Sequence, residues 1–213
     1  MGIGGLTSEV GKTTLLCKLL SAFPGWEAIK TTRGHYRSCG KDPHTCCVSD
    51  LLSAEAVVRS GRESTYAAGK DTGKYWEAGA ANVHWVIATD EQVEAGINDA
   101  LGRVKADGVF VEGNSFTEFV KPDFFLMVAR PDQTKIKLTA KRVLKSICAI
   151  YLSGNAQEAE RVPVLLGQGL AGLGPDLPVF SPHNFSALVE RVREIDSLTA
   201  LNAAANQSSV LVS

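Results

Sequence analysis

Apolar residues along the chain follow two patterns, short continuous runs and helical spacing. The continuous runs are rich in Val, Ile and Phe and are bounded by polar residues or glycine, so they predict buried strands. These runs are residues 26–32, 83–89, 108–113, 124–130 and 149–152. Helical spacing begins after Lys12 and recurs at residues 91–104, 135–147 and 185–195. Strands that alternate with helices predict a three-layer α/β domain with a mostly parallel central sheet.

The remaining segments are less regular. Residues 51–58 form a short apolar stretch that we interpret as a helix, and residues 162–166 and 178–180 predict late strands. No repeat or linker divides the chain, so we expect a single domain over residues 1–201. Residues 202–213 are small and polar and predict a flexible tail.

A glycine-rich loop runs directly into the first predicted helix. The backbone N–H groups of such a loop and the positive end of the helix dipole form an anion site. Lys12 is placed to reach the β- and γ-phosphate oxygens, and the Thr13 hydroxyl to bind Mg²⁺. The sequence therefore predicts a P-loop nucleoside triphosphatase. The predicted nucleotide contacts are Thr7, Ser8, Glu9, Val10, Gly11, Lys12, Thr13 and Thr14.

The loop departs from the usual spacing. Leu6 holds the place of the first glycine, and Gly5 lies one residue further from the Gly-Lys pair. This longer spacing resembles the loop of dethiobiotin synthetases, which are ATP-dependent enzymes. Only four residues precede Gly5, fewer than the roughly 5 of an ordinary strand. We expect either a very short first strand or a start codon upstream of Met1.

Polar side chains at predicted strand ends supply further candidates, since ligands of doubly wound sheets bind at the carboxyl ends of the strands. Lys30 is a second phosphate or substrate contact, or only a solvated strand end. Glu112 ends a buried strand, where an acid can hold Mg²⁺. Asp50 is a further candidate for Mg²⁺. Asn155 contacts the edge of the nucleotide base or caps the following helix. The sequence lacks the Asn-Lys-x-Asp motif with which P-loop GTPases bind guanine.

Three segments resemble the molybdopterin-guanine dinucleotide biosynthesis adaptor family. They are the Lys-Asp-Thr-Gly-Lys-Tyr-Trp-Glu-Ala-Gly-Ala run at residues 70–80, the Lys-Thr-Thr-Arg-Gly-His run at residues 30–35, and the Val-Glu-Gly run at residues 111–113. The resemblance implies a small GTP-binding dimer with weak GTPase activity that assists attachment of a nucleotide to molybdopterin. Asp71 is then a catalytic candidate together with Lys12 and Lys30, or it only caps a helix with Thr72 and leaves Lys74 and Tyr75 toward the ligand.

Cysteine and histidine gather in one predicted loop. Cys39, Cys46 and Cys47 lie near His35 and His44, and thiolate with imidazole is a donor set that Zn²⁺, Ni²⁺ or an iron–sulfur cluster accepts. The spacing matches no strong zinc pattern, so a redox-sensitive or merely tolerated thiol loop is the alternative. Cys17 and Cys148 lie in apolar patterns and are expected in the core.

Composition restricts the class of protein. The 213 residues are 45% hydrophobic and 21% charged with a formal net charge of -1, which excludes a disordered chain and a broadly basic nucleic-acid binder. No apolar run approaches the roughly 20 residues of a membrane span, and the first residues do not follow the order of a signal peptide. We expect a cytoplasmic protein whose partners are a nucleoside triphosphate, a cofactor-biosynthesis protein and a second copy of the chain.

Three functions fit these observations. The first is Mg²⁺-dependent binding and slow hydrolysis of GTP or ATP by an accessory protein in molybdenum-cofactor maturation. The second is an ATP-dependent ligase or kinase of the dethiobiotin synthetase type, in which Lys12 and Lys30 stabilise a transferred phosphoryl group. The third is a non-catalytic nucleotide-binding carrier of metal or sulfur that uses the cysteine loop.

Overall fold

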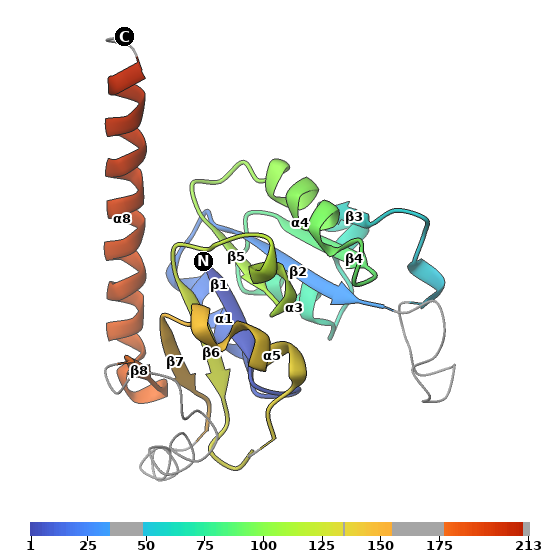
Figure 1. Ribbon diagram of the computed structural model, residues 1–213, viewed down its shortest axis with the longest axis horizontal. Coiled ribbons are helices and arrows are strands. Elements are labelled where there is room, and N and C mark those ends of the chain that lie inside the picture. Colours follow the sequence, from blue (N-terminus) through green and yellow to red (C-terminus); the bar gives the residue numbers. More distant parts are fainter. Residues whose placement is uncertain (35–48, 134, 155–176, 211–213) are drawn as a thin grey trace.

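A central β-sheet organises the protein (Figure 1). The structure is a computed structural model that describes residues 1–34, 49–133, 135–154 and 177–210, with side chains described to residue 202. Within this part of the chain the sheet has eight strands in the order β3-β4-β2-β5-β1-β6-β7-β8. Every neighbouring pair is parallel except β3 and β4, which are antiparallel at one edge. The strands are β1 (Gly2–Gly5), β2 (Glu27–Arg33), β3 (Val57–Ser60), β4 (Val83–Ala88), β5 (Val109–Glu112), β6 (Phe125–Ala129), β7 (Ala149–Leu152) and β8 (Val179–Phe180).

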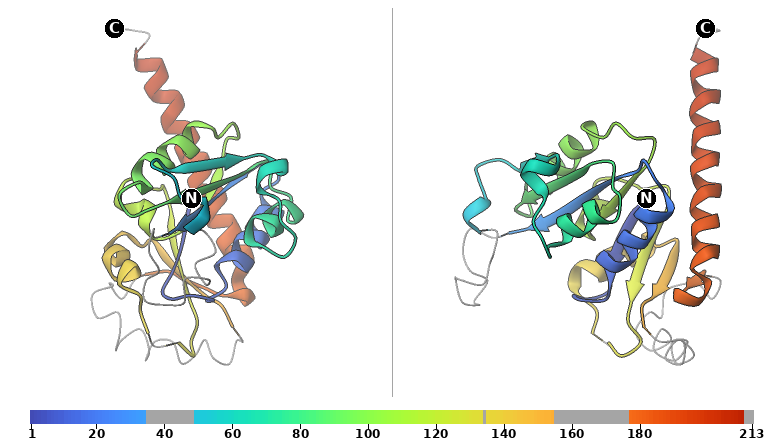
Figure 2. Two further views of the ribbon diagram at one scale, coloured as in Figure 1. Left: turned by 90° about the vertical axis from the view of Figure 1, so that its right-hand side faces the viewer. Right: turned by 180° about the vertical axis from the view of Figure 1, so that it is seen from behind.

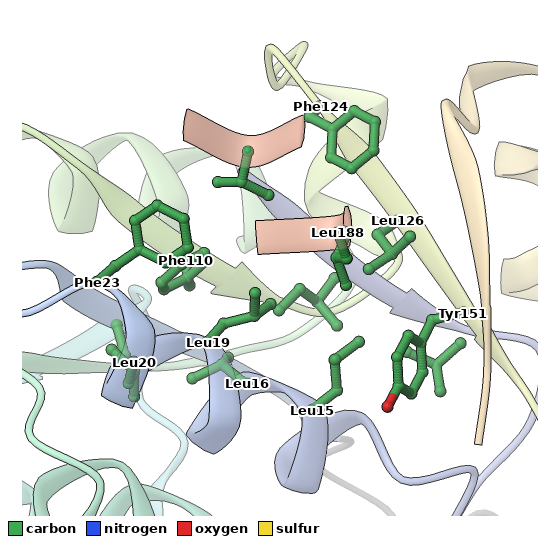
Figure 3. Close-up of a cluster of buried hydrophobic side chains, with 14 of the residues drawn as sticks. Leu15, Leu16, Leu19, Leu20, Phe23, Phe110, Phe124, Leu126, Tyr151 and Leu188 are labelled. Carbon is green, nitrogen blue, oxygen red and sulfur yellow. The ribbon is translucent and has the colours of Figure 1, made fainter. Parts of the chain in front are cut away.

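Helices cover both faces of the sheet. The helices are α1 (Lys12–Ala22), α2 (Arg62–Thr65), α3 (Asp71–Glu77), α4 (Val93–Gly102), α5 (Leu138–Val143) and α8 (Phe185–Val210). Leucines of α1 pack with Tyr75 of α3 and Leu188 of α8 against one face, as Figure 3 shows for α1 and α8. Ile97 of α4 and Val143 of α5 lie in the core on the other face. The expected three-layer α/β fold with a mostly parallel sheet is confirmed.

The position of β1 explains why four residues suffice for a central strand. It pairs with β6 through all four residues and with β5 through two, and all four residues are buried. A Cβ atom at Gly4 would lie 2.7 Å from Asn114 Oδ1 and from the Phe125 ring, so glycine lets both neighbours approach the strand. In this chain β1 is therefore a buried strand of four residues.

Two sequence interpretations need correction. Residues 51–58 are not a helix, since a 3₁₀ turn at Ser49–Leu51 precedes β3. The β-branched Val57 and Val58 pair with Ile87 and Val86 of β4, so the strand pairing prevails over the helical interpretation. The helix predicted for residues 135–147 is shorter, since α5 ends at Val143 and a 3₁₀ turn follows at Leu144–Ser146.

The last helix is longer than the predicted residues 185–195. It extends to Val210, so residues 202–210 continue a helix where we expected the tail to begin, and its C-terminal half projects beyond the other elements (Figures 1 and 2). The described helices include none that has both the length and the apolar character needed to cross a membrane. The predicted strand at residues 162–166 lies outside the described residues.

Candidate functional site

The loop after β1 lies at the carboxyl end of the sheet and is held there by its neighbours. Leu6 N donates to Val128 O of β6 at 3.0 Å, and Lys137 N donates to Leu6 O at 2.8 Å. The Ser153 hydroxyl, just after β7, donates to Val10 O at the far side of the loop. Because these bonds come from separate segments, the loop conformation is fixed by the sheet.

The loop presents a row of backbone donors. Glu9 has a φ of 57° and Gly11 a φ of 89°, so left-handed residues turn the chain into α1. Among the described residues, no acceptor receives a hydrogen bond from the backbone N–H groups of residues 7–14. Successive N–H groups without protein acceptors at a helix N-terminus form an anion site. The loop for which the sequence predicts phosphate contacts presents such a row of donors.

Asn114 fixes the entry to the loop and was missed by the sequence analysis. Its Oδ1 accepts from Gly5 N at 2.8 Å, and its Nδ2 donates to Gly5 O at 3.0 Å. The side chain thus replaces a strand partner at the point where β1 ends. A polar residue two positions after Glu112, directly after a strand end, was the available signal.

Lys12 lies across the end of β1. A Cβ at Gly5 would lie only 2.9 Å from Lys12 Cδ, so glycine at this position allows the lysine stem to cross the strand end. Burial lowers the pKa of Lys12. The charges of Lys30 and Lys137 lower the pKa of Lys12 further, and the Glu112 carboxylate opposes this shift. A partly buried ammonium beside other cations is poised to bind an anion.

A charged cluster lies beside the loop on the α1 and α3 face. Lys30 Nζ is 2.5 Å from Glu112 Oε1 and 2.7 Å from Asp71 Oδ2. Burial alone would lower the pKa of Lys30, but the Glu112 and Asp71 carboxylates raise it above its usual value. Burial likewise opposes ionisation of Asp71, yet Lys30 and Thr13 bring the pKa of Asp71 below its usual range. The three predicted residues therefore form one network of ion pairs centred on Lys30.

Two hydroxyl groups complete this cluster. Thr13 Oγ1 donates to Glu112 Oε2 at 3.2 Å, and the fully buried Tyr75 hydroxyl donates to the same oxygen. Burial and the adjacent Glu112 raise the pKa of Tyr75 well above its usual value, so the phenol remains a donor. Tyr75 was expected to face a ligand; it instead positions the carboxylate. The exposed Lys74 acts on the cluster through its charge, which helps to lower the pKa of Asp71.

The cluster has the donors that a magnesium ion needs. Thr13, Glu112 and Asp71 supply hydroxyl and carboxylate oxygens, which Mg²⁺ prefers, and their hydrogen bonds bring them together. No set of three or more His, Cys, Asp or Glu side chains suited to a metal occurs in the described part of the chain. One or two carboxylates completed by phosphate oxygens and water are the usual Mg²⁺ environment at phosphate sites, so the residues fit such an ion.

Two cavities flank the loop. One, of about 430 Å³, lies between α1 and the ends of β6 and β7 and is lined by Thr14, Lys18, Tyr151 and Ser153. The other, of about 160 Å³, lies on the α5 side and is lined by Lys12, Arg33 and Lys137 with no carboxylate among its described lining. The first is large enough for a flat heterocycle, and the second has the charge of an anion pocket.

Several predicted residues lie elsewhere. Asp50 is exposed in the 3₁₀ turn before β3, and the described contacts of Thr13 and Glu112 do not include it, so it is not part of the cluster. Asn155, Cys39, Cys46 and Cys47 lie outside the described residues, as do His35 and His44.

Cys17 and Cys148 pack against the two cores, and burial raises the pKa of Cys17 to about 11.

The capping role considered for Asp71 is wrong. Asp71 is the first residue of α3, Lys70 holds the cap position, and no side chain caps the helix. The Asp71 carboxylate pairs with Lys30 instead, because the strong ion pair outcompetes a neutral backbone donor.

The sequence matches no protein-family model and no curated protein.

Proposed function

We propose that the chain binds a nucleoside triphosphate, GTP or ATP, together with Mg²⁺ and hydrolyses it slowly. The observation that carries this proposal is the row of backbone N–H groups at residues 7–14 that have no acceptor among the described residues. The row leads into the N-terminus of α1, and the Lys12 ammonium lies at its edge. Such an arrangement binds the β- and γ-phosphates of a nucleotide.

Each residue of the site then has a role. Lys12 binds the terminal phosphate oxygens and stabilises charge that develops on them. Lys30 holds the Asp71 and Glu112 carboxylates in place until the cation binds. Asp71 is partly exposed and ionised, so it can orient a water molecule toward the phosphate. The cavity beside Thr14 and Tyr151 accepts the base.

Thr13 and Glu112, with Asp71 beside them, would hold the magnesium ion. When bound, such an ion neutralises phosphate charge and orients the β- and γ-phosphates. The Lys30 ammonium already lies against both carboxylates. Cation binding at this place therefore requires Lys30 to shift toward the phosphates or toward solvent.

The cellular role we propose is that of an accessory protein in molybdenum-cofactor maturation, acting with a cofactor-biosynthesis protein and as a homodimer in the cytoplasm. This part depends on the resemblance of residues 30–35, 70–80 and 111–113 to the adaptor family. A ligase or kinase of the dethiobiotin synthetase type is the second candidate. The position of Lys30 beside Asp71 favours it, because a substrate that accepts the phosphoryl group beside these two residues would lie next to the phosphates. A non-catalytic carrier function would depend on the cysteine loop outside the described residues.

Calorimetric titration with ATP and with GTP, each with and without Mg²⁺, tests the proposal. The wild-type chain should bind one triphosphate per chain with an affinity that Mg²⁺ increases. Lys12→Ala should weaken binding at least tenfold and leave the fold intact. Lys121→Ala is the matched control, because this exposed lysine precedes the amino-terminal end of β6, whereas the loop lies at the carboxyl ends of the strands.

The outcomes separate the candidates. GTP preference with slow turnover supports the adaptor role, whereas ATP preference with fast turnover of a small carboxylate supports the ligase. Nucleotide affinity that is equal in Lys12→Ala and the wild type would overturn the assignment of the loop.

A further inference from the structure

A third cavity lies on the far side of Lys30 from the phosphate loop. Its volume is about 600 Å³, larger than either cavity beside the loop, and most of its lining is apolar. Cavities of this size with a few polar groups are typical of small-molecule sites. Its walls come from β2, β3, β4 and the segment from α2 to α3.

Two aromatic side chains give this cavity flat surfaces of fixed orientation. Trp85 Nε1 donates to Thr32 Oγ1 at 2.9 Å, which sets the plane of the indole. The Tyr66 hydroxyl donates to Glu77 Oε1 at 3.2 Å, and the Arg62 guanidinium lies 4.5 Å from the Tyr66 ring centroid. Aromatic surfaces held in this way bind planar rings at a low entropic cost.

The charge of the cavity is positive. Arg59 lies 5.8 Å from the Trp85 ring centroid, and Lys70 lies on the wall before α3. The ion pairs formed within the described chain include neither Arg59 nor Lys70. Among the described lining residues the one carboxylate is that of Asp71, which is already paired with Lys30. A ligand that brings a negative charge would therefore satisfy two cations beside an aromatic surface.

We propose that this cavity binds a second small molecule, a planar aromatic anion whose ring packs on Trp85 and whose carboxylate or phosphate group binds Arg59 and Lys70. Lys30 and Asp71 line the cavity and also belong to the charged cluster with Glu112. A bound anion therefore lies next to the phosphate end of the nucleotide site. Binding of the aromatic anion depends on residues of this cavity alone. Its position next to a bound nucleotide rests on the proposed function.

The test uses 2-naphthoate as the probe and 2-naphthylmethanol as its uncharged counterpart, both titrated calorimetrically into the full chain. The wild type should bind 2-naphthoate at least tenfold more tightly than the alcohol. Arg59→Gln should remove this preference, and Trp85→Leu should weaken both probes. Arg191→Gln is the matched control for loss of an arginine, because Arg191 is exposed on α8. Circular dichroism of each variant verifies the fold, and Arg59→Gln keeps the test valid if Trp85→Leu does not fold.

Separate readouts distinguish this inference from the nucleotide proposal. Lys12→Ala should lose nucleotide affinity and keep 2-naphthoate affinity, while Arg59→Gln should show the reverse. Equal affinity for the two probes, or 2-naphthoate binding that Arg59→Gln does not change, would overturn the inference whatever the nucleotide result. Probe binding without nucleotide binding would support the second-ligand site and contradict only the proposed function.

Discussion

Lys30 Nζ lies 2.5 Å from Glu112 Oε1, and the two residues are register partners on the adjacent parallel strands β2 and β5. The Glu112 side chain is 2% exposed, so its charge depends on this lysine and on the hydroxyl groups of Thr13 and Tyr75. A buried carboxylate that loses its cation is costly, because neither water nor another charge replaces the lost partner. The pair therefore connects the stability of the sheet with the chemistry of the site.

Lys30→Met should lower the free energy of unfolding by about 3 kcal/mol, because it leaves the buried Glu112 without its cation. The double variant Lys30→Met with Glu112→Gln should be more stable than Lys30→Met alone, since the uncompensated charge is gone. Urea unfolding of the wild type, both single variants and the double variant measures this coupling. Additive effects of the two substitutions would show that the pair contributes no coupling.

Nucleotide affinity should fall as pH rises through the alkaline range. Burial lowers the pKa of Lys12, so its ammonium loses its proton at a lower pH than an ordinary lysine. The protonated form binds phosphate, so binding takes up a proton in this range and weakens as pH increases. Calorimetry from roughly pH 8, where the terminal phosphate is fully ionised, to pH 10 measures the slope.

Lys12→Arg provides the control for this pH dependence. A guanidinium stays charged throughout the range, so the variant should show weaker but nearly constant affinity. A wild-type profile as flat as that of Lys12→Arg would show that Lys12 does not titrate in contact with the nucleotide.

The sheet and the loop could be predicted from sequence because each depends on local signals. The apolar runs that become β2, β4, β5, β6 and β7 are short and continuous, as buried parallel strands require. The glycine, lysine and threonine of the loop lie next to one another in the chain. The end of a buried strand likewise indicated Glu112.

Contacts between segments that are distant in the chain could not be predicted. Ser153 and Val10 are 143 positions apart, and Asn114 and Gly5 are 109 positions apart, so only the topology of the sheet brings these pairs together. Residues 57–58 show no alternation of apolar and polar side chains that would identify an edge strand. Their conformation is decided by pairing with β4, which the local sequence does not indicate. The sequence indicates Asp71 as a site candidate, but its ion pair with Lys30 depends on tertiary structure.

Asn114→Ala should loosen the start of the phosphate loop. It removes both hydrogen bonds to Gly5, and we expect the free energy of unfolding to fall by about 2 kcal/mol and nucleotide affinity to fall roughly tenfold. Urea unfolding and calorimetric titration measure the two effects. Asn98→Ala on the exposed face of α4 is the matched control and should change neither. Wild-type nucleotide affinity in Asn114→Ala would show that this side chain does not hold the loop for binding.

Glu27 provides the opposite case, a buried carboxyl group that we expect to act on stability alone. Its Oε1 accepts from Lys105 N at 3.0 Å and from Ala106 N at 3.1 Å, and its Oε2 lies 2.7 Å from His84 Nε2. Glu27→Ala leaves the buried His84 ring without this partner and two partly buried backbone N–H groups without this acceptor, so the free energy of unfolding should fall by about 3 kcal/mol. Urea unfolding measures this loss, and Glu94→Ala at an exposed position of α4 should leave stability near the wild-type value.

Nucleotide affinity of folded Glu27→Ala should equal that of the wild type. Glu27 is the first residue of β2, whereas Lys30 lies further along the strand toward its carboxyl end. The loop and the charged cluster lie at that end. Calorimetric titration at a temperature well below the unfolding midpoint separates the two effects. A tenfold loss of affinity in a fully folded variant would mean that the start of β2 is coupled to the phosphate loop, and the stability role of Glu27 would then no longer be independent of the site.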